Sequence, residues 1–176
     1  LIEDAFGFCQ SQLRELLRAV AAYAAGRSVL SAYCYTGAFE LHAARAGATG
    51  LIGLDSSAPA LERARSHHAL NGLAVPVEYR DADVPLALRK FRDEARRFDL
   101  IILDPPRFVL STAQKEKGLR AYKDINLLAL KLLAPGGMTA AAALPLASAR
   151  ASRLVSTKAA AGAGNAGAAC GAGAGM

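Results

Sequence analysis

Cysteine is scarce in this sequence, with three residues in 176, at Cys9, Cys34 and Cys170. Their number is odd, and their spacing matches no metal-binding motif. These features exclude a disulfide framework and a cysteine-based metal site, and they favour a reduced, cytoplasmic setting. The three histidines have no carboxylate or cysteine at metal-ligand spacing. We therefore expect no bound metal.

Long apolar runs are also missing. Before the alanine- and glycine-rich end, no stretch of about 18 apolar residues is free of both charge and glycine, so we expect no membrane-spanning helix and no membrane partner. Glu3 and Asp4 stand where a signal peptide would carry basic residues. Because the first residue is Leu1 rather than methionine, we expect a fragment whose N-terminal neighbour is missing.

Acidic residues are fewer than basic ones, 15 against 21, which gives a formal net charge of +6. A positive excess of this size suits a polyanionic partner. An ordinary solvated basic surface explains it equally well, and the sequence leaves both interpretations open. A chain of 176 residues is long enough for one domain with a sizeable core.

Short apolar runs, typical of buried strands, alternate with segments that have helical periodicity. The expected strands lie near residues 28–32, 51–54, 75–79, 99–103 and 138, and the expected helices cover 12–25, 38–46, 58–70, 85–96 and 119–133. Regular alternation of this kind predicts an α/β fold with a doubly wound, mostly parallel sheet.

Polar residues follow the carboxyl ends of the first four expected strands: Thr36, Asp55, Asp83 and Asp104. Because the ends of parallel strands meet at one edge of a sheet, we expect these side chains to share a rim that binds a nucleotide-like cofactor. A carboxylate at the position of Asp55 can accept both hydroxyls of a ribose. The alternative is that Asp55 only caps the next helix, with Ser56 and Ser57 as further capping residues.

A dinucleotide-dependent dehydrogenase would also place an acid after its second strand. Such an enzyme carries the motif G-x-G-x-x-G after the first strand. Here the corresponding loop reads Y-C-Y-T-G-A-F, residues 33–39. The sequence therefore argues against a dinucleotide cofactor.

Six segments together carry a family resemblance: YCYTGAF, GLDSSAPALERAR, ALNGL, RDADV, FDLIILDPPRF and RAYKDINLLALKLLAPGG. They resemble class I S-adenosylmethionine-dependent methyltransferases, and more narrowly the branch that forms 5-methylcytosine in large-subunit ribosomal RNA. The resemblance spans about residues 28–137. Its most specific parts are DPPRF, where the family usually has lysine for Arg107, and YKDIN; a related guanine-methylating branch shares YTG and DPP but not YKDIN.

The resemblance implies a Rossmann-like fold, S-adenosylmethionine as cofactor and RNA as partner. It divides the chain into a helical lead-in, residues 1–27, and a methyltransferase domain, residues 28–176. The implied cofactor contacts are Tyr35, Thr36 and Gly37 at the methionine end, Asp55 with Ser56 at the ribose, Asp83 and Val84 at the adenine, and Asp104. The implied catalytic residues against the target base are Asp104 and Pro105. The implied substrate contacts are Pro106, Arg107, Phe108, Tyr122 and Lys123.

The residues themselves support this assignment. An acid beside rigid proline carbonyls can accept a hydrogen bond from the exocyclic amine of an unstacked cytosine. Phe108 and Tyr122 suit base stacking, but a core position for both has equal weight. The lysines and arginine between 115 and 123 suit an RNA path or, nearly as well, a solvated helix face.

One expected residue is absent. Carbon 5 of cytosine is a poor nucleophile, so methyltransferases of this branch first add a cysteine thiolate to carbon 6. The resemblance puts that cysteine where this sequence has Leu144. Three explanations stay open: a relic that only binds cofactor or RNA, a nitrogen target that needs no thiol, or alanine and glycine letters that stand in for other side chains over 138–176. An intact mass equal to that of the printed sequence would refute the third.

Overall fold

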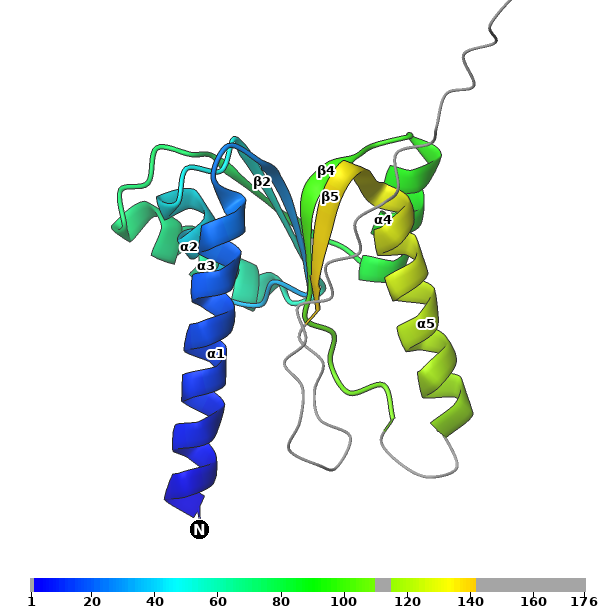
Figure 1. Cartoon of the computed structure of the whole chain (residues 1–176), viewed down its shortest axis with the longest axis horizontal. Helices are drawn as coiled ribbons and strands as arrows, with labels where there is room; N and C mark the ends of the chain where they lie inside the picture. Colours follow the sequence, from blue (N-terminus) through cyan, green and yellow to red (C-terminus); the bar gives the residue numbers. More distant parts are fainter. Residues whose placement is uncertain (1, 110–114, 142–176) are drawn as a thin grey trace, which may run out of the picture.

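The computed structural model of the chain describes the backbone of residues 2–109 and 115–141 and the side chains of 13–109 and 115–140. In this part of the chain, five parallel strands form one sheet in the order β3-β2-β1-β4-β5 (Figure 1). The strands are β1 (Ser28–Ala32), β2 (Gly50–Asp55), β3 (Val77–Asp81), β4 (Phe98–Leu103) and β5 (Leu133–Ala141). The predicted α/β fold with a doubly wound parallel sheet is confirmed.

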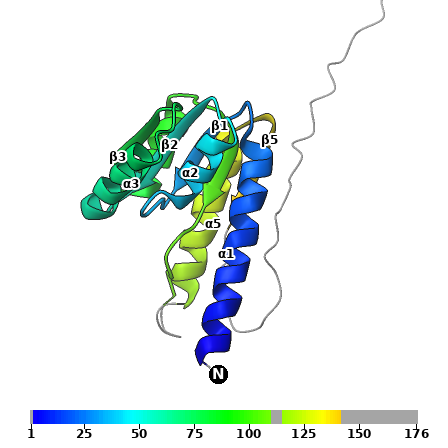
Figure 2. The same ribbon diagram turned by 90° about the vertical axis from the view of Figure 1, so that its left-hand side faces the viewer.

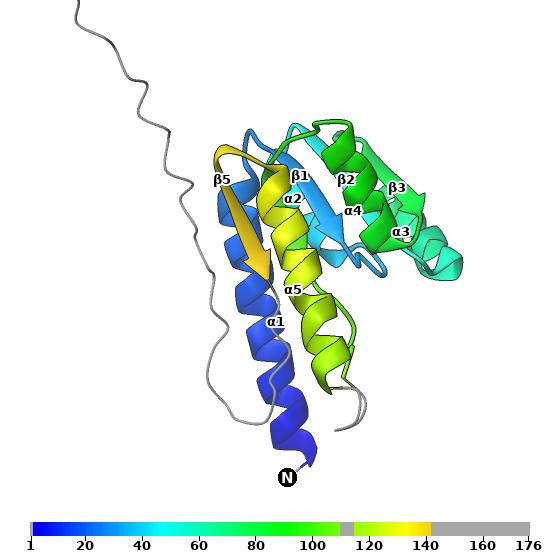
Figure 3. The same ribbon diagram turned by 90° about the vertical axis from the view of Figure 1, so that its right-hand side faces the viewer.

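Helices cover both faces of the sheet. They are α1 (Ile2–Ala24), α2 (Ala38–Arg45), α3 (Ala58–Leu70), α4 (Val84–Asp93) and α5 (Lys115–Leu132). The first three lie on one face (Figure 2), and α4 and α5 lie next to each other on the opposite face (Figure 3). The strand order changes direction between β1 and β4, which is the place where open α/β sheets bind ligands.

The three central strands, β1, β2 and β4, are buried on both faces, which explains their nearly continuous apolar sequences, whereas the edge strand β3 is partly exposed. In β4, Leu100 and Ile102 pack on the side of α1 and α2, whereas Ile101 and Leu103 pack on the side of α4 and α5. In β1, Val29 likewise packs on the side of α1 and α2, and Leu30 packs on the side of α4 and α5. Val20 and Ala24 of α1, with exposed fractions of 1% and 0%, belong to the apolar cluster that contains Leu100 and Ile102.

Several boundaries differ from those expected. The helix expected over 12–25 begins at Ile2, β3 is displaced by two residues from 75–79 to Val77–Asp81, and α5 begins at Lys115 rather than at 119. The chain turns from α5 directly into β5, which begins at Leu133 rather than near 138 and includes the Pro135-Gly136-Gly137 segment. Propensity gives the kind of each element, but packing and capping decide where it ends.

Helix α4 shows how capping shifts a boundary. The Asp83 side chain accepts a hydrogen bond from the Leu86 N–H (2.9 Å), so the helix begins at Val84. At the other end, Ala95 adopts a left-handed φ of 54°. The Ala95 and Arg96 N–H groups donate to the carbonyl oxygens of Arg92 (3.0 Å) and Phe91 (2.9 Å), which is the Schellman pattern. The helix therefore ends before Arg96, without the glycine that usually marks such an end.

Candidate cofactor and substrate site

The loop after β1 is a tight turn that leads into α2. Gly37 is the N-cap of α2 with φ of 81°, and its N–H donates to the Cys34 carbonyl oxygen (3.0 Å). A Cβ atom at this position would lie 2.7 Å from the Tyr79 hydroxyl oxygen, so glycine is required by both conformation and space. Tyr33 and Tyr35 also have positive φ, 66° and 49°. Two strained residues beside a glycine with positive φ are typical of a ligand-binding turn.

Asp55 fastens this loop to the end of β2. One carboxylate oxygen accepts the Tyr35 N–H (2.8 Å), and the other accepts the Ser57 N–H (2.9 Å) at the start of α3. Each oxygen keeps a lone pair, so the carboxylate can still accept two hydroxyl groups. Asp55 therefore does contact the start of α3, as the capping alternative expected, and it also holds the loop after β1. Ser57 is the N-cap residue of α3, one of the two serines expected there, but its side chain makes no capping hydrogen bond.

Asp104 lies at the same edge, on the other side of the loop. Ala32, the last residue of β1, is paired with Leu54 of β2 and with Leu103 of β4, so Asp55 and Asp104 follow directly on its two sides. The Asp104 N–H donates to the Ala32 carbonyl oxygen (3.2 Å). Burial raises the pKa of the Asp104 carboxyl above its ordinary value. A carboxylate in this position favours a ligand that donates hydrogen bonds.

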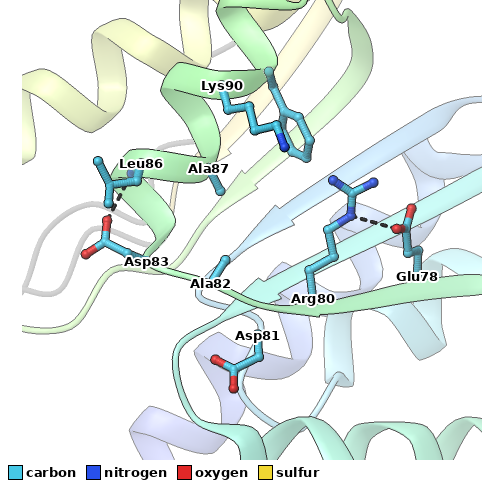
Figure 4. Close-up of a pocket in the computed structure, with 9 residues that line it drawn as sticks. Glu78, Arg80, Asp81, Ala82, Asp83, Leu86, Ala87 and Lys90 are labelled. Carbon is cyan, nitrogen blue, oxygen red and sulfur yellow. Dashed lines mark hydrogen bonds and ion pairs between the residues drawn. The ribbon is translucent and has the colours of Figure 1, made fainter.

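The two predicted adenine contacts differ in accessibility. Asp83 is exposed but uses one oxygen to cap α4, whereas Val84 is 2% exposed and packs in the core. Asp83 also lines a recess of about 560 Å³, together with Glu78, Arg80, Asp81, Ala82, Leu86, Ala87, Lys90 and Phe91 (Figure 4). This recess lies beside β3 and α4. Of the predicted cofactor contacts, Asp83 alone lines it, so we place the predicted site at the rim between Asp55 and Asp104 instead.

The loop after Asp104 is held by α5. The Tyr122 hydroxyl donates to the Pro106 carbonyl oxygen (3.1 Å) and accepts from the Phe108 N–H (3.2 Å). The rings of Phe108 and Tyr122 lie 4.7 Å apart, and Phe108 meets Tyr33 edge-on at 6.2 Å. Both side chains are half-buried, so they are neither fully enclosed in the core nor fully open for base stacking. Tyr122 therefore positions the loop that would face a substrate.

The remaining predicted contacts lie around these residues. Tyr35 is 62% exposed, and Ser56, Pro106, Arg107 and Lys123 are exposed, whereas Pro105 is buried. The Thr36 carbonyl oxygen lies 3.2 Å from His67 Nδ1. Their roles as cofactor and substrate contacts stay predictions. Leu144 lies outside the described residues.

Three side chains near the site are not among the predicted site residues: Tyr33, Glu40 and Tyr79. Burial, with smaller contributions from Asp83 and Asp55, raises the pKa of Tyr33 to about 12. Glu40 is fully buried, and neither of its oxygens has a hydrogen-bond partner among the described residues. Its position could have been found, because Glu40 lies one helical turn before the small apolar pair 43–44 that faces the core.

Cys34 is the cysteine closest in sequence to the predicted site, and its side chain is 4% exposed. Burial and the nearby Glu40 and Asp55 carboxylates raise the pKa of its thiol well above the ordinary value. A thiol of this kind is a poor nucleophile. Among the described residues, no group of three or more histidine, cysteine, aspartate or glutamate side chains could hold a metal ion. None of the described helices is long and apolar enough to cross a membrane.

The donor set fits S-adenosylmethionine. Asp55 offers free lone pairs to ribose hydroxyls, the exposed Asp83 keeps one oxygen for an amino group, and the strained loop 33–37 lies between the ends of β2 and β4. The residues present therefore fit an adenosyl group, and their roles as cofactor contacts stay predictions.

Comparison with known proteins gives the same assignment. The family described as S-adenosylmethionine-dependent methyltransferase matches residues 7–161. The ribosomal RNA large subunit methyltransferase I of Shewanella denitrificans is 50% identical over 123 residues, which cover 69% of this chain and 31% of that protein. The chain thus spans about a third of the length of the curated relatives that it matches.

Solved structures agree with the fold. The protein SMU.776, complexed with S-adenosylhomocysteine, is 27% identical with a TM-score of 0.63, covering 75% of this chain and 34% of that one. The SAM-dependent methyltransferase of Agrobacterium tumefaciens is 25% identical with a TM-score of 0.60, covering 76% and 44% of the two chains. With its doubly wound sheet, its acid-flanked loop after β1 and a family match over most of its length, this chain belongs to the S-adenosylmethionine-dependent methyltransferases.

Proposed function

We propose that this chain is the cofactor-binding part of a cytoplasmic RNA methyltransferase that forms 5-methylcytosine in large-subunit ribosomal RNA. The observation that carries the proposal is the position of Asp55 and Asp104 on the two sides of the strained loop after β1. The names of the relatives support ribosomal RNA as the substrate. The motifs DPPRF and YKDIN support cytosine as the target.

Each residue has a role in this proposal. S-adenosylmethionine, when bound, supplies a methyl group on a positively charged sulfur. Asp55 accepts the ribose hydroxyls, and its bond to the Tyr35 N–H keeps the loop in place. Asp104, half-buried beside Pro105, accepts the exocyclic amine of the target base. Tyr122 holds the backbone of the loop after Asp104 in place through two hydrogen bonds.

The nucleophile is the open part of the proposal. Cys34 belongs to the loop after β1, but its side chain is buried and its thiol has a raised pKa, so it is unsuited to attack carbon 6 of a base. A nitrogen target, which requires no thiol, is the second candidate. The poor suitability of Cys34 favours it.

Calorimetry with S-adenosylhomocysteine tests the shared part of both candidates. We expect binding to the full chain, and at least tenfold weaker binding by Asp55→Ala, because the ribose would lose its acceptor. Asp93→Ala, which removes an exposed carboxylate on α4, is the matched control and should bind like the wild type. A folded wild-type chain without affinity for S-adenosylhomocysteine contradicts both candidates.

Methylation of ribosomal RNA separates the candidates. Incubation with S-adenosylmethionine, followed by mass mapping of the modified nucleoside, should give 5-methylcytosine. A methyl group on a base nitrogen would establish the second candidate. Cofactor binding without any methyl transfer would indicate a binding relic.

A further inference from the structure

Positive charge is concentrated on one face of the molecule. Residues 84–97, which comprise α4 and its exit, and residues 115–132 of α5 together contain ten lysines and arginines against four acidic residues. Their excess of six equals the formal net charge of the whole chain, +6. On the opposite face, the exposed charged side chains described on α1, α2 and α3 comprise five basic and two acidic residues, a smaller excess of three.

The charges on this face are available to a partner. Of the ten basic side chains, nine are exposed: Arg89, Lys90, Arg92, Arg97, Lys115, Lys117, Arg120, Lys123 and Lys131. Arg96 is half-buried and stacks on the rings of Phe91 (4.7 Å) and Phe98 (5.4 Å). Three of the exposed ones form ion pairs with described residues, at 3.9, 2.7 and 3.5 Å. Such exposed pairs contribute at most about 1 kcal/mol and yield readily to a phosphate.

The two helices form a continuous surface. On α4, Arg89 and Arg92 lie one turn apart on one flank, while Lys90 lines the recess beside β3 on the other flank. Helices α4 and α5 lie side by side (Figure 3), and α5 lies over the half of the sheet that holds β4 and β5. Because β3 is at the far end of the sheet, we infer that the flank of α4 away from the recess is the one nearer α5. We call the exposed surface of residues 84–97 and 115–132 the α4–α5 face.

This face leads to the proposed base site. Tyr122 and Lys123 are adjacent on α5, and Tyr122 bonds the loop that follows Asp104. A strand whose base lies against Asp104 would continue past this helix, where its phosphates would meet the exposed cations.

We propose that the α4–α5 face is a contact surface for RNA, which binds phosphates of the strand that flanks the target nucleotide. This inference rests on the proposed function. Single-stranded RNA is favoured over other anionic partners because α5, which carries five of the cations, holds a loop with half-buried aromatic rings that suits unstacked bases. An anionic lipid surface is the competing partner, since Leu119, Leu127 and Leu130 of α5 are 45–46% exposed.

Two triple variants of the full chain test the proposal. Arg89→Gln with Arg92→Gln and Lys131→Gln removes three charges from the α4–α5 face, and Arg14→Gln with Arg18→Gln and Arg63→Gln removes three exposed charges from α1 and α3. The two variants have equal net charge, so a difference between them reports the location of the charges. None of the six residues is a predicted contact of the cofactor, and urea unfolding verifies that both variants are folded.

The measurement is fluorescence anisotropy of a single-stranded RNA oligonucleotide at several salt concentrations. We expect the α4–α5 triple variant to bind at least tenfold more weakly at 100 mM salt, with the slope of log K against log salt reduced by about 2, because each lost phosphate contact removes about 0.7. The α1–α3 triple variant should stay within twofold of the wild type.

Three results would overturn the proposal. The first is an equal loss of RNA affinity in both triple variants, and the second is a wild type that shows no salt-dependent RNA binding. The third is wild-type binding to phosphatidylserine vesicles that is as tight as binding to RNA and is lost in the α4–α5 triple variant. The proposed function fails separately. A wild type that binds RNA through this face but never methylates it contradicts the proposed function and leaves the surface in place.

Discussion

At the scale of single residues, the site depends on buried polar groups beneath the loop after β1. Glu40, Ser31 and Tyr79 are all buried there, and none of their side-chain oxygens has a hydrogen-bond partner among the described residues. Burial raises the pKa of Glu40 to about 7, although the nearby Ser31 hydroxyl and the backbone N–H of Glu40 lower it in part. A carboxyl group of this kind couples folding to protonation.

The sign of this coupling gives the first prediction. The pKa of Glu40 rises from its ordinary value of 4.5 to about 7 on folding, so the folded state holds the proton more tightly. The stability from this group is complete below about pH 4.5 and is lost as pH rises through 7, a change of about 3 kcal/mol. Glu40→Gln should remove this pH dependence. The free energy of unfolding of the variant, relative to that of the wild type, should therefore rise by about 3 kcal/mol between pH 4.5 and 8 in urea unfolding. The exposed Glu62→Gln is the control, and a constant difference between Glu40→Gln and wild type would contradict the prediction.

Gly37 gives the second prediction. Alanine at this position combines a left-handed φ, which costs about 1 kcal/mol, with a clash against the Tyr79 hydroxyl, which costs about 1–3 kcal/mol. Tyr79→Phe removes that hydroxyl, which has no partner among the described residues, and should itself change stability by less than about 1 kcal/mol. In a double-mutant cycle of urea unfolding, Gly37→Ala should cost less in the Tyr79→Phe background. Additive effects would show that the strain lies in the backbone alone.

At the scale of elements, helix ends and loop contacts set the geometry of the site. Ala95 ends α4 in a conformation that glycine adopts without strain. We expect Ala95→Gly to raise the free energy of unfolding by about 1 kcal/mol. The same substitution at the exposed Ala22 inside α1 should lower it by about 1 kcal/mol. Equal signs for the two substitutions would contradict the assignment of the helix end.

Tyr122 links α5 to the loop after Asp104, and its hydroxyl makes two hydrogen bonds to that loop. Tyr122→Phe removes both, each with a net value of about 1 kcal/mol. We expect hydrogen exchange of the Phe108 amide to quicken at least tenfold and RNA methylation to fall at least tenfold, while affinity for S-adenosylhomocysteine stays within twofold. Tyr23→Phe on the exposed side of α1 should change none of the three. Unchanged exchange at Phe108 would mean that the loop is held by other contacts.

At the scale of the whole molecule, α1 packs into the same core as the sheet, because Val20 and Ala24 join residues of α2 and β4 in one apolar cluster. The division of the chain at residue 27 stays a prediction, but this packing makes one cooperative unit the expected behaviour. Val20→Ala should lower the free energy of unfolding by about 2 kcal/mol, and Leu13→Ala, at a side chain 46% exposed, by less than about 1 kcal/mol. A separate early transition for α1 in urea would support the division instead.

The sequence by itself determined the kinds of elements and their order. Apolar strands two to three dozen residues apart, separated by amphipathic helices, allow few topologies other than a doubly wound parallel sheet, and polar residues after four strands already mark one rim. Gly37 and the family motifs could also be identified from the sequence, because each reflects a local requirement of the chain.

The tertiary structure alone decided which strand ends are neighbours and what lies beneath them. The pairing of Ala32 with both Leu54 and Leu103 brings Asp55 and Asp104 to the two sides of one loop, and it depends on the strand order, which local sequence does not encode. The buried Glu40, the two bonds of Tyr122 and the gathering of nine exposed cations on the α4–α5 face also depend on which surfaces meet. Packing between residues far apart in the chain fixes these contacts, because burial and charge at one position are set by elements elsewhere in the sequence.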